Sequence, residues 1–444
     1  MTRLIRAGVL VALGCVVTAT LIAQTVFPTG TTIFDPDRTW SGFTVLSPLA
    51  TQAVPVIDMN GTVVKRWDGF NNSAGGPARV LPGGYVIAAS GARPPNQESL
   101  ELVERDFDGK VVWSVSARQH HDWQREDFPA GYYSPGSSPN PQNNDRTLLL
   151  THVTHLKPAV ADVEIQDDRL IEVSRTNDVL WEWVASDHVD EFKFSPEARK
   201  VIKAGPASNG PSGVAGRRVF DWLHVNSAHY LGPNRWFDAG DTRFAPTNII
   251  ISSREASLLA IVGRDGRIVW QMGPDYSAST ELRAIRQVIG QHHAHLIPNG
   301  LPGAGNLLVF DNGGSSGYGF FSPIGPDGRS ALARSTSRVL EINPVTLELV
   351  WSYTNPRFFA SNISGAQRLP NGNTLITSGP TGRIFEVTKE GAIVWEYLWP
   401  SFGGANNQNS VYRAYRIPYS WIPQLPVPKE RKVTPPALGD FRVP

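Results

Sequence analysis

The sequence predicts an all-β protein, a six-bladed β-propeller. Three observations favour this fold. A short turn-and-tryptophan segment recurs six times, and a second turn element precedes several of its copies. The chain is also rich in Gly (41), Pro (35) and Trp (13) for its 444 residues. Frequent tight turns explain the Gly and Pro, and aromatic side chains fit the half-buried faces of sheets.

The recurring segment consists of a turn, then β-branched residues, then Trp. Its copies are Asn60–Trp67, Asp108–Trp113, Asn177–Trp181, Asp265–Trp270, Thr346–Trp351 and Glu390–Trp395. Asp-Gly and Asn-Gly are typical of tight hairpins, because Gly accepts positive φ. The Val-Val-Trp part alternates between the two faces of a strand. We therefore expect each copy to be a hairpin that returns into a strand.

The second element is a Pro-Gly or Pro-Asn-Gly turn, seen at residues 81–87, 296–300 and 369–376. Such turns join two strands. The two elements together describe a four-stranded antiparallel blade, and blades arranged radially form a propeller. A solenoid could carry the same repeat and is the alternative. The uneven spacing of the Trp residues predicts insertions, and residues 187–203 have the pattern of a helical one.

The N-terminus has the pattern of an export segment. Arg3 and Arg6 precede the uncharged, largely apolar run Ala7–Ala23. This pattern is typical of a signal peptide or a short membrane-anchor helix, with a buried N-terminal helix as the alternative. We expect an exported protein, either periplasmic or anchored with its propeller on the extracytoplasmic side.

We expect four regions along the chain. Residues 1–26 form the signal peptide or anchor, 27–55 an extension, 56–420 the propeller and 421–444 a Pro-rich tail.

Composition excludes several classes of function. The 41 Lys and Arg residues nearly balance 40 Asp and Glu residues, giving a net charge of +1 without a basic stripe. Nucleic-acid binding is therefore disfavoured. The single cysteine, Cys15, lies in the leader, which excludes thiol catalysis, disulfides and Cys-based zinc sites from the main body. We expect small-molecule partners and no cofactor.

The ten histidines are clustered. Nine of them fall in four segments, Gln119–Asp122, His152–His155, Asp221–His229 and Gln291–His295. These segments lie early in successive units, where the innermost strand is expected. Because innermost strands line the central channel of a propeller, histidines from different blades can meet at one point there.

Each histidine also has a structural interpretation. We assign His155, His188 and His229 to hydrogen-bonded structural roles and leave His152 open. Adjacent pairs such as His292 and His293 point to opposite faces, so we expect one of each pair to face the channel. Imidazoles also bind metals, but no His-Glu-x-x-His spacing is present, and a His-only site would have to be assembled across blades.

An ordered series of motifs resembles the bacterial arylsulfate sulfotransferases from about residue 100 onward. The motifs are Asp221–Ser227, Ser252–Arg254, Gly266–Trp270, Gln291–Ala294, Phe310–Gly313, Ser337–Glu341, Gln367–Leu375 and Tyr412–Arg416. The resemblance implies a six-bladed propeller that moves a sulfuryl group from an aryl sulfate ester to a phenol without a nucleotide donor.

The resemblance also implies roles for particular residues. The nucleophile of the Gln-His-x-Ala motif is His292, and supporting roles fall on His224, Asn226 and Arg254. A further histidine from an earlier blade matches the pair His120 and His121, without indicating which of the two.

These residue types suit the reaction. Sulfuryl transfer, like phosphoryl transfer, is expected to pass through a loose transition state with charge on its outer oxygens. An Arg, an Asn amide and a protonated His would stabilise that charge. A neutral imidazole can attack sulfur, and a second His, either His224 or one of the pair at 120 and 121, can exchange the phenol proton. No metal is needed.

The sequence departs from the family pattern in two places. Only residues 27–55 stand where the family has a sizeable N-terminal β domain that helps dimerisation, so the oligomeric state stays open. Residues 237–246 are an insertion between the His-Val-Asn and Ser-Ser-Arg motifs. Two alternatives remain: a propeller that binds a ligand or partner without catalysis, and a His-metal hydrolase or oxidoreductase.

Overall fold

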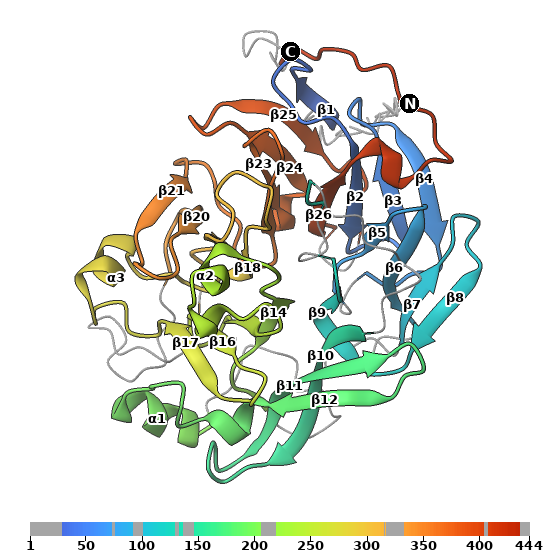
Figure 1. Cartoon of the computed structure of the whole chain (residues 1–444). Coiled ribbons are helices and arrows are strands. Elements are labelled where there is room, and N and C mark those ends of the chain that lie inside the picture. The colour runs from blue at the N-terminus through green and yellow to red at the C-terminus, as the bar shows by residue number, and fades with distance from the viewer. Residues whose placement is uncertain are drawn as a thin grey trace, which may run out of the picture.

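Six sheets stand around a central axis in the computed structural model of the chain (Figure 1). The structure describes residues 29–72, 76–91, 101–128, 133–135, 146–205, 219–314, 316, 333–403 and 407–435. The predicted six-bladed β-propeller is confirmed. The solenoid alternative is excluded, because the last strand of the chain pairs with an early strand and closes a ring.

Each blade is an antiparallel sheet that extends from the axis outward. Blade 1 contains, in that order, β26 (Val411–Ile417), β2 (Phe43–Pro48), β3 (Ala53–Ile57) and β4 (Val63–Asp68). Blade 2 contains β5 (Arg79–Leu81), β6 (Tyr85–Ser90), β7 (Glu101–Arg105) and β8 (Val111–Val115). Blade 3 contains β9 (Gln119–Arg125), β10 (Arg146–Leu156), β11 (Glu164–Ser174) and β12 (Val179–Val184), and the short β13 (Phe220–Asp221) adds in parallel to β11.

The second half of the ring follows the same plan. Blade 4 contains β14 (Val225–Tyr230), β15 (Ile249–Ser253), β16 (Leu258–Val262) and β17 (Ile268–Met272). Blade 5 contains β18 (His292–Leu296), β19 (Leu307–Asp311), β20 (Arg338–Ile342) and β21 (Leu349–Tyr353). Blade 6 contains β22 (Gly365–Arg368), β23 (Thr374–Ser378), β24 (Arg383–Val387), β25 (Ile393–Leu398) and β1 (Gly30–Phe34).

The hydrophobic core lies between neighbouring blades. Middle strands such as β16 and β19 are almost continuously apolar, since both of their faces are covered. Phe310 of blade 5 and Phe385 of blade 6, for example, both pack against Phe358. No blade buries its own two faces, so each depends on its neighbours.

The recurring tryptophans join the blades into a ring. All six lie on the fourth strand of a blade, as the hairpin prediction requires. Each indole N–H donates to a backbone carbonyl in the turn before the fourth strand of the next blade, at 2.7–3.2 Å. The bonds run from Trp67 to Asp106, Trp113 to Arg175, Trp181 to Arg264, Trp270 to Pro344, Trp351 to Lys389 and Trp395 to Met59.

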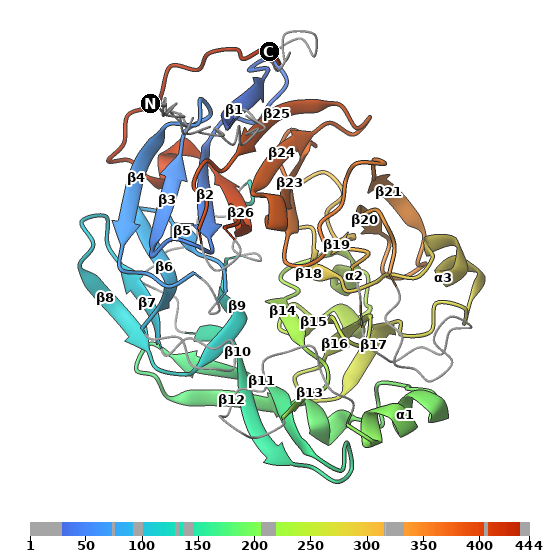
Figure 2. The same cartoon turned by 180° about the vertical axis from the view of Figure 1, so that it is seen from behind.

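The ring is closed by both ends of the described chain. The C-terminal strand β26 is the innermost strand of blade 1 and pairs with β2 (Figure 2). The N-terminal strand β1 adds to the outer edge of blade 6 by pairing with β25, and Phe34 pairs with Val433 of the C-terminal tail. The propeller therefore begins before the expected boundary at residue 56, because an extended segment can complete a sheet edge without carrying the Trp repeat.

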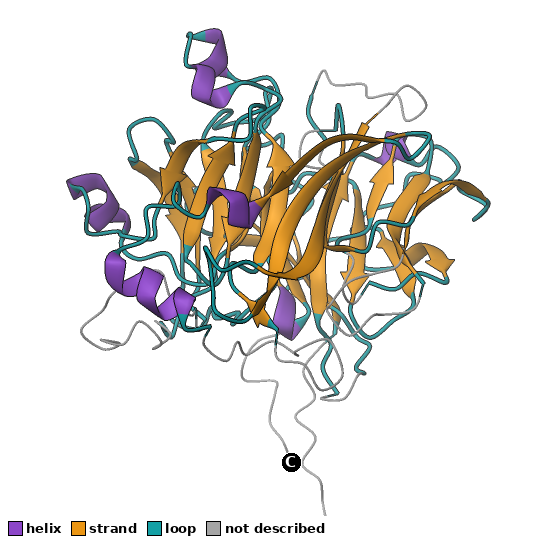
Figure 3. Cartoon of the chain, turned by 90° about the horizontal axis from the view of Figure 1, so that it is seen from below, coloured by secondary structure: helices purple, strands orange, loops and turns teal. Residues whose placement is uncertain are grey.

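Helices are short and lie outside the sheets (Figure 3). The expected helical insertion at 187–203 contains α1 (Pro196–Lys203). The expected insertion at 237–246 includes the end of α2 (Arg235–Asp238) and all of η3 (Thr242–Phe244). The other helices in the part of the chain that the structure describes are α3 (Thr280–Ile285), η2 (Ala185–His188), η4 (Gly379–Thr381) and η5 (Tyr419–Trp421). Within the described ranges, no helix combines the length and apolarity that crossing a membrane requires. The predicted export segment at residues 1–26 lies outside the described residues.

The indole bonds predict a difference between two neighbouring tryptophans. Trp395 donates to the carbonyl of Met59 at 2.8 Å, whereas the buried indole N–H of Trp399 has no hydrogen-bond partner among the described residues. Replacing Trp by Phe removes the indole N–H and a similar ring volume at both positions. We expect Trp395→Phe to lower the free energy of unfolding by about 1 kcal/mol more than Trp399→Phe. Urea unfolding of both variants measures the difference, and equal losses would contradict the structural role of the ring of bonds.

Candidate active site

The candidate site lies at the axis, where the innermost strands of four blades begin. Figure 1 shows β9, β14, β18 and β26 near the middle of the ring. Each carries or follows a histidine or arginine: His121, His224, His292 and Arg413. Charges on these groups act on one another, so the four side chains share one neighbourhood.

His292 is the first residue of β18 and is 2% exposed. Its Nδ1 lies 2.8 Å from Oδ1 of Asn312 and 3.1 Å from the carbonyl oxygen of Gly290. The Asn312 amide is itself fixed, because its Nδ2 donates to the carbonyls of Ala360 and Ile363. Since both partners of His292 Nδ1 are acceptors, Nδ1 carries the proton and Nε2 presents a lone pair.

The environment keeps His292 neutral. Burial is the largest cause that holds its pKa well below the ordinary value. The hydrogen bond to Asn312 opposes this, but the positive charges of Arg254 and Arg413 lower the pKa further. A neutral imidazole with a free Nε2 is the nucleophilic form of histidine.

His224 is coupled to a carboxylate. Its Nδ1 lies 2.6 Å from Oδ2 of Asp221, three residues earlier. Burial lowers the pKa of His224, but the charge and hydrogen bond of Asp221 more than offset this, so the pKa lies above its ordinary value. His224 and His292 thus have pKa values displaced in opposite directions, as in sites that pair a proton donor with a nucleophile.

His121, rather than His120, faces this neighbourhood. The His121 ring lies edge-on to the His224 ring with their centroids 4.8 Å apart, and it is 6.4 Å from the Tyr412 ring. His120 is fully buried and stacks on His152 in the adjoining part of blade 3. The two Nδ1 atoms of His120 and His121 are 2.8 Å apart.

Arg254 and Asn226 have different relations to the site. Arg254 follows β15, forms an ion pair with Glu255, and its charge lowers the pKa values of both His292 and His224. Asn226 is buried, and its Nδ2 donates to the carbonyl of Gln291 at 2.7 Å. In this conformation the amide holds the backbone just before His292.

A repeated backbone feature positions these side chains. His121, His224 and His293 have φ values of 54°, 50° and 58°, in the left-handed region, at the start of the innermost strand in three successive blades. The pairing register shifts beside each one. Such a conformation costs a non-glycine residue about 1–2 kcal/mol and often occurs at functional sites. It also interrupts the strict alternation on which the expectation for His292 and His293 rests.

Both histidines lie near the axis, and His293 contacts His229, Tyr415 and the backbone N–H of Ala366 from three other blades.

Sequence comparison bears directly on this arrangement. A model of the family described as Arylsulfotransferase (ASST) matches residues 123–399. The chain belongs to the arylsulfotransferase family. The matched range includes His224, Asn226, Arg254 and His292, and it begins just after His120 and His121.

No protein of curated function has a significant sequence match to this arylsulfotransferase family member. Similar solved structures include a protein of unknown function from Bacteroides caccae, with 12% identity, a TM-score of 0.42, and coverage of 85% of this chain and 99% of that one. A functionally unknown protein from Desulfotomaculum acetoxidans has 11% identity, a TM-score of 0.39 and coverage of 85% and 100%. Virginiamycin B lyase from Staphylococcus aureus has 10% identity, a TM-score of 0.34 and coverage of 83% and 84%.

A buried charge cluster lies next to the site at the axis. Asp122 forms ion pairs of 2.9 Å with both Arg79 and Arg413, and its Oδ2 lies 3.1 Å from Nε2 of His229. All four side chains are no more than 1% exposed. Burial raises the pKa of Asp122, but Arg413, His229 and Arg79 together hold it well below its usual range. The cluster joins blades 1 to 4 and fixes the charge of Arg413 beside His292.

Two histidines lie outside the site. The half-exposed His155 pairs with Asp167 at 2.9 Å, and His188 stacks on Trp183 and contacts Glu191 at 2.7 Å.

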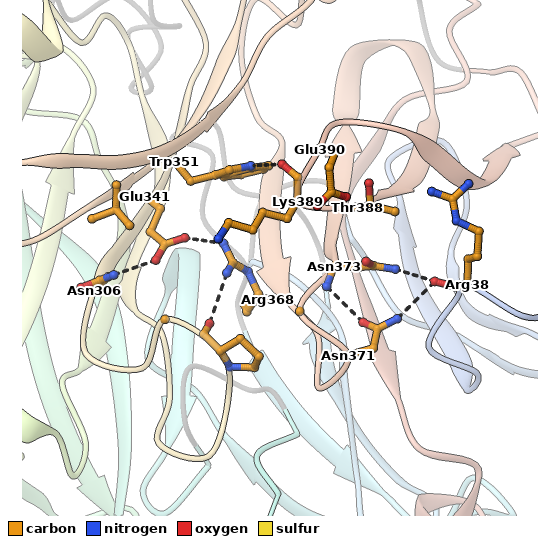
Figure 4. A pocket seen from close by; sticks show the side chains of 14 residues that line it. Arg38, Asn306, Glu341, Trp351, Arg368, Asn371, Asn373, Thr388, Lys389 and Glu390 are labelled. Carbon is orange, nitrogen blue, oxygen red and sulfur yellow. Dashed lines mark hydrogen bonds and ion pairs between the residues drawn. The ribbon is translucent and has the colours of Figure 1, made fainter.

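A pocket of about 680 Å³ is also separate from the site, since the residues around it come from the junction of blades 5 and 6 and include none of the candidate histidines. Figure 4 shows Glu341 there between Asn306 and Arg368, which it holds at 2.6 Å each.

Sequence reasoning missed four residues that shape the site. They lie within the family motifs, but the sequence assigns no role to them: Asn312, Asp221, Arg413 and Tyr412. The Tyr412 hydroxyl donates to the carbonyl of His121 at 2.9 Å. A signal was present for Asp221, since an Asp three residues before a His can reach its imidazole. The Asn312 contact crosses from β18 to the end of β19, which the sequence does not reveal.

The opposite pKa displacements can be measured directly. NMR of protein with isotope-labelled histidine rings follows each titration. We expect the pKa of His224 to lie above the ordinary value of 6.5 and His292 to be neutral at that pH. Asp221→Asn should lower the pKa of His224, because it removes the negative charge that favours the protonated ring. A His224 resonance that titrates at the same pH in both proteins would contradict the assigned coupling.

Proposed function

We propose that this family member moves a sulfuryl group from an aryl sulfate ester to a phenolic acceptor, through a covalent sulfo-histidine at His292 and without a nucleotide donor. The observation that carries the proposal is the fixed tautomer of His292. Its Nδ1 faces two acceptors, Asn312 Oδ1 and the Gly290 carbonyl, so the lone pair of Nε2 is available for attack. Family membership supports the reaction class.

In the first half-reaction, His292 Nε2 attacks sulfur. The N–S bond forms as the bond from sulfur to the aryl oxygen breaks, and the electron pair of that bond leaves with the phenolate. Protonated His224 gives its proton to the phenolate oxygen. The Asp221 carboxylate 2.6 Å away favours that protonated form and orients the ring.

In the second half-reaction, the acceptor phenol replaces the leaving phenol. The now neutral His224 takes the phenolic proton while the acceptor oxygen attacks sulfur and the N–S bond breaks. His292 returns to its neutral form and His224 to its protonated form, so the enzyme ends each cycle unchanged. His224 and His292, whose pKa values are displaced in opposite directions, therefore act in both half-reactions.

Positive charge beside His292 suits the sulfuryl oxygens. Arg254 and Arg413 both act on the His292 imidazole, and Arg413 is held in place by Asp122 and the carbonyl of Asn226. Preorganised charges of this kind stabilise a transition state whose negative charge lies on outer oxygens. His121, edge-on to His224, is placed to donate a further hydrogen bond.

We also propose that the protein acts outside the cytoplasm. Support comes from the sequence alone, where Arg3 and Arg6 precede the apolar run Ala7–Ala23.

The covalent intermediate gives the main test. Brief exposure of purified protein to an aryl sulfate, followed by intact-mass analysis, should reveal one added sulfuryl group on the native chain and none on His292→Ala. His155→Ala, which removes a histidine outside the site, should still form the adduct. No adduct and no phenol release from a panel of aryl sulfates would overturn the proposal and favour a propeller that only binds ligands.

The orienting groups predict partial losses. Asn312→Ala frees the His292 ring to place its proton on Nε2, so we expect formation of the adduct to slow by about 100-fold while the fold is retained. Asp221→Asn should lower turnover by about 100-fold or more by weakening acid–base exchange at His224. Rates equal to the native rate in single-turnover assays would contradict these roles.

A further inference from the structure

We propose that blade 3 holds a divalent transition-metal ion between His120, His152 and Asp168, next to the sulfuryl-transfer site. The three side chains come from β9, β10 and β11, which are neighbouring strands of one sheet. His152 and Asp168 are register partners across β10 and β11, so ordinary strand pairing brings them together. The sequence alone predicts that a site made only of histidines needs several blades, whereas this set includes a carboxylate and lies within a single blade.

The three donor atoms lie close together. Asp168 Oδ1 lies 3.4 Å from His120 Nε2 and 3.3 Å from His152 Nε2, and all three donor atoms lie within 4.8 Å of one another. Zinc bonded tetrahedrally to nitrogen and oxygen at about 2.0–2.1 Å places its ligand atoms about 3.3–3.4 Å apart. These two distances match a tetrahedral ion better than direct hydrogen bonds of about 2.9 Å. The rings of His120 and His152 stack 14° from parallel with their centroids 3.3 Å apart, so each ring must rotate to direct its Nε2 at a shared ion.

Burial makes the cluster costly without a cation. The side chains of His120, His152 and Asp168 are each no more than 2% exposed. His120 Nε2 and Asp168 Oδ1 have no hydrogen-bond partner among the described residues although both atoms are buried, which is rare in folded proteins. A bound cation would satisfy both atoms at once. Two imidazoles and a carboxylate are a ligand set that zinc and other first-row metals accept.

The outer atoms of two of the ligands, Asp168 and His120, are held as those of metal ligands usually are. Asp168 Oδ2 accepts from the backbone N–H of Val225 at 3.0 Å, which leaves Oδ1 toward the histidines. His120 Nδ1 lies 2.8 Å from His121 Nδ1. The side-chain amide nitrogen of Gln166 lies 2.9 Å from Nδ1 and 3.1 Å from Nε2 of His152, so metal binding at Nε2 would require this amide to turn and present its oxygen to the Nδ1–H.

The metal has a consequence for the transfer site, and this consequence rests on the proposed function. Binding through Nε2 leaves the proton of His120 on Nδ1, so His120 donates to His121 Nδ1. His121 then carries its own proton on Nε2 and can donate to a sulfuryl oxygen. The ion would act by fixing the tautomer of His121, with no contact to the substrate.

The test uses tag-free, full-length protein stripped with a chelator and then dialysed against Zn²⁺. We expect one zinc per chain by elemental analysis, and Co²⁺ in its place should give the visible absorption of a tetrahedral site. His152→Gln and Asp168→Asn should each weaken zinc binding by about 100-fold or more, beyond the usual effect of losing an outer partner. His155→Gln, on the same strand as His152, should bind zinc like the native chain.

Circular dichroism checks that each variant is folded. If one of the two ligand variants fails to fold, the other still decides the test. Native protein that takes up none of Zn²⁺, Co²⁺, Mn²⁺ or Fe²⁺ would overturn the proposal. So would zinc binding that survives in folded His152→Gln and Asp168→Asn, or that is lost equally in His155→Gln. The adduct assay at His292 is read separately, so zinc binding without an adduct would leave the metal site standing while the proposed function fails.

Discussion

Six bonds from an indole N–H to a backbone carbonyl set the geometry of this molecule. Each one links the fourth strand of a blade to the same turn of the next blade, and Trp395 returns the series to blade 1 through Met59. One such bond contributes only about 1 kcal/mol. Their importance is geometric, because each joins the same two places in neighbouring blades. Repeated six times, the link favours a closed ring whose innermost strands surround one axis, where the histidines lie.

The charge at that axis performs two tasks. Burying Asp122 with Arg79 and Arg413 costs desolvation energy, and removing one partner from such a pair typically costs about 3–5 kcal/mol, because the other charge is left buried. In return, Arg413 is held rigidly beside His292. Its positive charge disfavours protonation of His292, in addition to the larger effect of burial. In the proposed reaction the same charge would also favour the negative oxygens of a sulfuryl group.

Much of the fold could be predicted because its elements are local. The Asp-Gly turn and the following Val-Val-Trp describe a hairpin and its outer strand within a few residues, and all six copies occur where expected. The closure could not be predicted, because β1 and β26 carry no Trp repeat and pair with segments far away in the sequence.

The site was predictable in its clusters but not in its details. Left-handed φ values at His121, His224 and His293 break the alternation on which sequence reasoning relied. The choice between His120 and His121, and the contact from Asn312 to His292, depend on tertiary geometry alone.

The position of β26 in blade 1 has a consequence for the life of the protein. Strands β2 to β4 are made early and expose an unpaired edge until the final strand arrives, and exposed edges are prone to wrong pairing. That same final strand carries Tyr412 and Arg413 into the site. The ring closes and the candidate site is completed only after β26 has been made, so a product truncated before β26 would expose that unpaired edge and lack part of the site.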